Sequence, residues 1–113
     1  MHTKLKLADV LATNQDLFHP CFTGFGCEEG WAQIIAEMLV QWRRLELPCI
    51  TVVKEKLGLL RITCEDRTDT KATALAREFE KRSAGICDQC GAVGQLRTFH
   101  GYVATRFEGC YLK

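Results

Sequence analysis

The sequence predicts an α+β domain in which a β-hairpin packs against two amphipathic helices, followed by a small zinc-ribbon-like C-terminal hairpin. The chain contains two segments with helical apolar spacing, two short β-branched segments around a glycine, and a Cys87-x-x-Cys90 pair. Its 113 residues, 47% hydrophobic and 26% charged, suit one globular domain. We therefore expect a single domain over 1–113, with an α+β body over 1–85 and the tail over 86–113.

The first third of the chain predicts a short helix and then an aromatic loop. Residues 4–14 place apolar side chains on one side of a helix, whereas residues 15–29 lack a helical period and include a proline and two glycines. This loop is unusually aromatic, so we expect it to pack on the core near the helix that follows. Its aromatic residues are Phe18, Phe22 and Phe25.

The strongest helix is predicted over 30–45. Acidic residues precede it and Arg43 and Arg44 lie at its end, and both charges suit the helix dipole. Pro48 helps to end it. Its apolar face recurs with a period of 3.6 residues and comprises Trp31, Ile34, Ile35, Met38, Leu39 and Trp42.

A hairpin over 49–64 and a second amphipathic helix over 70–83 complete the predicted body. The link Lys56–Leu57–Gly58 supplies a glycine for the positive-φ position of a tight turn. In the helix, Ala72, Leu75, Ala76 and Phe79 form the apolar face. Three basic residues gather on the hairpin, and nearby acids make a mixed solvated face the plainer interpretation: Lys54, Lys56 and Arg61.

The tail carries the main chemical signal. Two cysteines separated by two residues, here Cys87 and Cys90 with a glycine after them, let two thiolates converge on one tetrahedral ion. Cys110 follows a second predicted hairpin that turns at His100–Gly101, where a ribbon's second knuckle returns to the first. We therefore expect a structural zinc site at Cys87, Cys90 and Cys110.

The fourth ligand of this site is open. The expected position is Lys113, whose amine must lose a proton before it binds a metal. His100 is the best local substitute, although a histidine at a hairpin tip is equally well explained as solvated. Cys21, Cys27, His19 and the terminal carboxylate are further donors, and a site without metal is the remaining alternative.

Charge and composition narrow the function classes. The formal net charge of +1 provides no strong field toward nucleic acid, and no apolar run is long enough to cross a membrane. Seven cysteines without a secretion signal favour metal ligation or buried thiols and a cytoplasmic location. No nucleophile–base arrangement or cofactor motif is evident, so we expect no enzyme activity and no small-molecule substrate. Arg97 and Arg106 on the second hairpin are weak candidates for nucleic-acid contact.

Four consecutive sequence blocks cover most of the chain: CEEGWAQIIAEML, VVKEKLGLLRI, AREFEKRSAGICDQCGAVGQLR and GYVATRFEGC. Together they resemble a small protein family of phages and prophages of proteobacteria that has no established activity. Members of that family end in a Cys-x-x-His knuckle, whereas this chain has Lys113 at the histidine position. The resemblance implies a mobile-element origin. Together with the small size, the near-neutral charge and the lack of catalytic motifs, it leads us to expect a non-enzymatic protein that binds a host protein or ribonucleoprotein complex in the host cytoplasm. An anti-defence, anti-CRISPR-like inhibitor is one form of this, and a zinc-ribbon nucleic-acid-binding regulator is the alternative.

Overall fold

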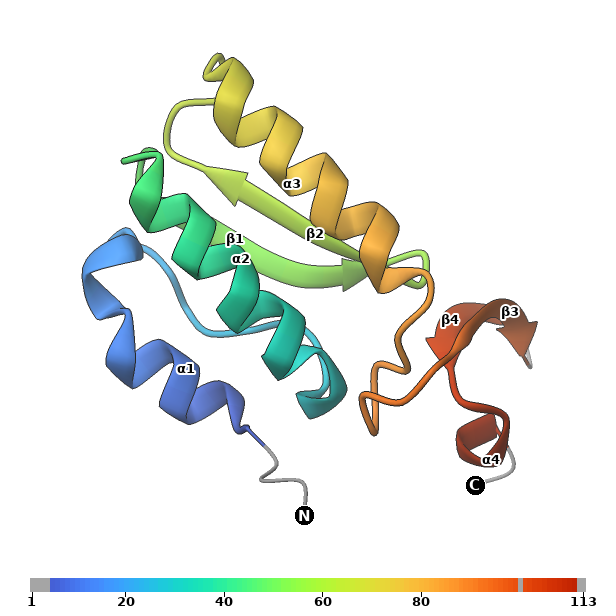
Figure 1. The fold of residues 1–113 in the computed structure, drawn as a ribbon. Helices are drawn as coiled ribbons and strands as arrows, with labels where there is room; N and C mark the ends of the chain where they lie inside the picture. The colour runs from blue at the N-terminus through green and yellow to red at the C-terminus, as the bar shows by residue number, and fades with distance from the viewer. Residues whose placement is uncertain (1–4, 100, 112–113) are drawn as a thin grey trace.

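The computed structural model describes residues 5–99 and 101–111 and has the predicted α+β class (Figure 1). Its elements agree with the expected order, except for a short last helix, α4, that the sequence did not predict. The elements are α1 (Leu7–Thr13), the 3-10 turns η1 (Gln15–Leu17) and η2 (Glu29–Trp31), α2 (Ala32–Arg44), β1 (Ile50–Lys56), β2 (Leu59–Cys64), α3 (Thr70–Ser83), β3 (Gln95–Phe99), β4 (Tyr102–Arg106) and α4 (Glu108–Tyr111).

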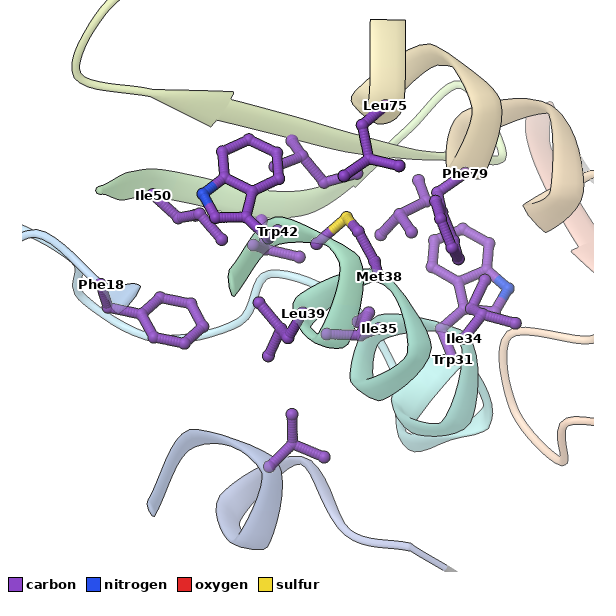
Figure 2. Packing of buried hydrophobic residues seen from close by; sticks show 14 of the residues in the cluster. Phe18, Trp31, Ile34, Ile35, Met38, Leu39, Trp42, Ile50, Leu75 and Phe79 are labelled. Carbon is purple, nitrogen blue, oxygen red and sulfur yellow. The ribbon is translucent and has the colours of Figure 1, made fainter. Parts of the chain in front are cut away.

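The core lies between the β1–β2 hairpin and the two long helices. Helices α2 and α3 lie on the same side of the hairpin, and α1 packs against α2 (Figure 1). The predicted apolar face of α2 is buried almost completely. Figure 2 shows Met38 and Trp42 on the side toward the strands and α3, and Leu39 on the side toward Phe18 and α1. Each fully buried large apolar side chain contributes about 1.5–3 kcal/mol. The large apolar side chains of the core that are at most 1% exposed are Trp31, Ile35, Met38, Leu39, Trp42, Ile50, Val53, Leu60 and Phe79.

The turn between β1 and β2 confirms the predicted role of its glycine. Lys56 pairs with Leu59, which leaves Leu57 and Gly58 as a two-residue loop. Both loop residues have positive φ, 53° for Leu57 and 84° for Gly58, as a type I′ turn requires. The carboxylate of Glu55 accepts a hydrogen bond from the Gly58 amide at 2.6 Å and closes the loop.

The aromatic loop packs on the core, as expected. Phe18 is 9% exposed, and its ring centroid lies 4.4 Å from that of Phe22 and 5.8 Å from that of Phe25. The loop also follows β1, because the amide of Gly26 donates to the carbonyl of Val53 at 2.9 Å. This pairing covers the outer edge of β1, which the sequence did not predict.

The tail packs closely against the body. At the start of α2, the amide of Gly30 donates to the carbonyl of Asp88 at 2.9 Å, and a Cβ at Gly30 would meet the carbonyl carbon of Asp88 at 2.5 Å. The indole of Trp31 donates to the carbonyl of Ile86 at 2.9 Å. At the hairpin tip, the buried hydroxyl of Thr105 donates to the carbonyl of Gly58 at 2.7 Å. Three separate contacts therefore fix the tail in place.

Candidate metal centre

The two ends of the tail bring three cysteines together. Cys87 and Cys90 lie in the turn after α3, and Cys110 lies in α4 beyond the β3–β4 hairpin. Their Sγ atoms all lie within 4.8 Å of one another. Cys87 is fully buried and Cys110 is 7% exposed, while Cys90 lies nearer the surface. The structure thus assembles the three cysteines singled out from the spacing.

Backbone hydrogen bonds hold the Cys87–Cys90 turn in a knuckle. The amide of Cys90 donates to Sγ of Cys87 at 3.5 Å, and the amide of Gly91 donates to the carbonyl of Cys87 at 3.0 Å. The Cys87 amide donates to the carbonyl of Ala92 at 2.7 Å. Amides directed at a cysteine sulfur stabilise the thiolate, the form that binds a metal.

The three thiols do not have equal acidity. Burial raises the pKa of the Cys87 thiol, but hydrogen bonds from the amides of Phe107, Cys90 and Gln89 outweigh it, so that pKa falls below its ordinary value. Burial and hydrogen bonds with the other two cysteines raise the pKa of Cys110 to about 11. A proton must therefore leave Cys110 when a metal binds, which makes metal affinity pH-dependent.

The donor set fits a soft divalent ion. With a Zn–S distance of about 2.3 Å, tetrahedral coordination places sulfurs about 3.8 Å apart, and the Sγ atoms here lie no more than 4.8 Å from one another. Thiolate ligands favour zinc, copper(I) or iron–sulfur clusters over magnesium or calcium. The three cysteines are therefore able to hold a metal ion.

The fourth position is not filled by any other side chain that the structure describes. Within residues 5–99 and 101–111, no further histidine, cysteine or carboxylate joins the cluster. The predicted substitute His100, like Lys113, lies outside the described residues. Cys21 is exposed and Cys27 is half-buried, and neither belongs to the cluster. Burial and then the neighbouring carboxylates raise the pKa of Cys27 to about 12, so it stays a thiol at neutral pH.

An ion pair braces the knuckle from inside. Asp88 is 4% exposed, and its carboxylate accepts from Nε of Arg106 at 3.1 Å. Its amide donates to the carbonyl of Thr105 at 2.9 Å. Burial raises the pKa of Asp88, and the charge of Arg106 acts against that rise. Sequence reasoning missed Asp88, because an acid between two knuckle cysteines carries no signal of its own.

The two candidate nucleic-acid residues differ in their surroundings. Arg106 is directed inward: besides Asp88, it donates to the hydroxyl of Tyr102 at 3.0 Å, and its side chain is 16% exposed. Arg97 is exposed on β3. Both line a surface depression of about 280 Å³ that also includes Phe107. Arg106 therefore serves first as the partner of Asp88.

Comparisons with protein-family models, curated proteins and solved structures find no match to this chain. The resemblance to a phage and prophage family therefore stays a prediction. Among the described residues, no helix has the length and apolar character needed to cross a membrane.

Proposed function

We propose that Cys87, Cys90 and Cys110 bind one zinc ion as a structural centre. The observation that carries this proposal is that their Sγ atoms lie within 4.8 Å of one another although they come from opposite ends of the tail. When bound, zinc would cross-link the knuckle to α4. The tail is short of core, since Ala104, Cys87 and Cys110 are its only buried apolar residues among those described, so a metal cross-link would add much of its order.

We further propose that the zinc-braced fold is a phage- or prophage-encoded interaction protein without enzyme activity. It would act in the host cytoplasm by binding and modulating a host protein or ribonucleoprotein complex, for instance as an anti-defence inhibitor. The small size, the net charge of +1 and the resemblance of the sequence blocks support this role. Exposed apolar side chains on the tail support it too, since they suit protein contact: Val93, Leu96, Tyr102 and Phe107.

Native mass spectrometry with metal analysis tests the zinc centre. We expect one zinc per chain in wild-type protein and in Cys21→Ser, the matched control, because Cys21 is exposed and lies outside the cluster. Cys87→Ser should lose the metal. Metal-free wild-type protein after production with ample zinc, or equal zinc content in Cys87→Ser, would contradict the site.

Affinity capture tests the interaction role. The zinc-loaded protein is immobilised and exposed to proteobacterial lysate, and bound complexes are identified after cross-linking. We expect stoichiometric recovery of one host complex, and a loss of activity of that complex when the protein is added. Recovery of no host protein would count against the proposal.

The nucleic-acid alternative rests on one observation, that Arg97 and Arg106 line the same depression on the tail. It predicts affinity that falls steeply with salt and weakens in Arg97→Ala. Arg106→Ala is less informative, because it also removes the partner of Asp88. A gel shift without binding at low salt would eliminate this alternative.

A further inference from the structure

The outer edge of β2 offers backbone groups for another strand. On the far side of the hairpin, Val53 and Glu55 use their outward carbonyl and amide to bond Gly26. In an antiparallel pair, residues directly opposite share this outward orientation. Ile62 pairs with Val53 and Leu60 pairs with Glu55, so both direct their backbone groups away from β1.

This edge is only partly occupied. The amide of Leu60 donates to the hydroxyl of Ser83 in α3 at 2.9 Å. Further along β2, the outward amide of Ile62 has no hydrogen-bond partner in the described part of the chain. The aromatic loop covers the edge of β1, whereas no strand covers the edge of β2 among the described residues.

A groove of about 430 Å³ lies at this same edge, between β2 and α3. Its lining combines an apolar part with a charged part. Half-buried Ala76 supplies the accessible apolar surface, because Trp42 and Ala72 in the lining are almost fully buried. The strand contributes Ile62, Thr63 and Cys64, and the charged residues are Arg61, Arg67, Arg77, Asp66 and Glu80.

The charge in the groove is positive. No ion pair is made by Arg61, Arg67 or Arg77 within the residues that the structure describes. Asp66 and Glu80 oppose them. The carboxylate of Asp66 accepts from the amide of Thr68 at 3.0 Å and from its hydroxyl at 2.6 Å, and these neutral donors leave its negative charge in place. Three arginines therefore face two acids, and the groove lining carries a net charge of +1.

We propose that this groove binds an extended acidic peptide segment of a partner protein by strand addition to β2. Main-chain hydrogen bonds to Ile62 would fix the peptide, an apolar side chain would lie against Ala76, and the neighbouring acids would face the arginines. The proposal builds on the interaction function above and specifies its surface. A second copy of the chain suits the edge less well, because two β2 edges would bring Arg61, Arg67 and Arg77 of both copies together.

Binding of a defined peptide tests the groove. The probe is a fluorescein-labelled peptide of alternating Glu and Val, about six residues long, matching a typical strand. Its controls are the same peptide N-methylated at alternate amides and a Lys/Val peptide. Protein variants are Arg77→Glu, which reverses a groove charge, and Lys71→Glu, which makes the same charge change on α3 outside the groove lining. Glu80→Gln removes one of the two opposing acids.

Anisotropy should show binding to wild type that weakens about tenfold in Arg77→Glu and strengthens in Glu80→Gln, with Lys71→Glu unchanged. Neither control peptide should bind. Amide exchange measured by NMR should slow at Ile62 when peptide is added, while Leu60, whose amide is already bonded to Ser83, changes little.

Several results would overturn strand addition. In the anisotropy assay, these are no binding of the Glu/Val peptide at low salt, binding of the N-methylated peptide as tight as that of the unmodified one, and equal losses of affinity in Lys71→Glu and Arg77→Glu. In the exchange experiment, they are an unchanged rate at Ile62 on addition of peptide, and protection of Ile62 that grows with protein concentration alone. The two proposals separate cleanly. If Arg77→Glu captures its host partner as well as wild type does, the peptide-binding groove is overturned and the interaction function stands. If the peptide binds but no host partner is captured, the interaction function is overturned and the groove stands.

Discussion

A single methyl group at Gly30 tests whether the tail is locked onto the body. In the structure, a Cβ at this position would lie 2.5 Å from the carbonyl carbon of Asp88 and 2.6 Å from its oxygen, with the carbonyl of Cys87 closer still. These are backbone atoms of the cysteine knuckle, so they cannot swing aside as a flexible side chain would. Gly30→Ala must therefore displace the knuckle from the start of α2.

The expected cost follows from three contributions. Overpacking against backbone costs about 1–3 kcal/mol. The hydrogen bond from Gly30 to Asp88, 2.9 Å in the native protein, is strained or lost, at about 1 kcal/mol. In the opposite direction, the substitution stabilises the protein by about 0.4–1 kcal/mol, because alanine restricts the conformations of the unfolded chain. The free energy of unfolding should fall by about 2 kcal/mol, which at an m-value of about 2 kcal/mol per molar lowers the urea midpoint by about 1 M.

Urea unfolding followed by far-UV circular dichroism measures this difference, with Gly85→Ala as the matched control. A Cβ at Gly85 would meet only the carbonyl of Arg82, at 3.9 Å, so that variant should stay close to wild type. Equal midpoints for Gly30→Ala and Gly85→Ala would refute the close packing of knuckle and helix. Zinc affinity measured on the same proteins should fall in Gly30→Ala alone, because the displaced knuckle carries Cys87.

Three further measurements address the core, the body–tail contact and a surface ion pair. Phe79→Ala empties a fully buried site, and calorimetry should show a loss of about 3–5 kcal/mol. Trp31→Phe leaves the carbonyl of Ile86 without its indole donor, and urea titration should show a cost of about 1–3 kcal/mol. The hydrogen bond from Arg43 holds the pKa of Asp16 below its ordinary value of 3.8. Stability from this pair is thus present above pH of about 4 and lost as pH falls through the lowered pKa; in an NMR titration Arg43→Gln should raise the pKa of Asp16.

The sequence was most informative where a single periodic pattern decides the structure. Helix α3 begins and ends at the predicted residues because its apolar side chains recur with the helical period and Asp69 caps its first turn, accepting from the amide of Ala72 at 2.8 Å. Helix α4 was missed because it has only four residues, too few for any period. The pairing of the aromatic loop with β1 was missed because it depends on backbone groups, which look alike in every residue.

In the candidate metal centre, too, one part could be predicted from the sequence and another could not. The spacing of Cys87, Cys90 and Cys110 sufficed to predict their convergence, since a knuckle and a returning hairpin lead the chain back to one point. The surroundings did not follow from spacing. Arg106, a weak candidate for nucleic-acid contact, is paired with Asp88, because the knuckle brings a buried carboxylate within reach of β4.

The three contacts between tail and body couple zinc binding to the stability of the whole chain. An ion that binds only the native arrangement adds stability by mass action, about 2.7 kcal/mol at a hundredfold excess over its Kd. If the tail were an independent finger, that gain would stay in the tail and the unfolding of the β1–β2 hairpin would not respond to zinc. Because Gly30, Trp31 and Gly58 bind the tail directly, we expect zinc to raise the urea midpoint of the entire fold. This zinc-induced rise in the urea midpoint should be equal in wild type and Phe79→Ala, whose knuckle is intact. It should be smaller in Gly30→Ala, whose knuckle is displaced.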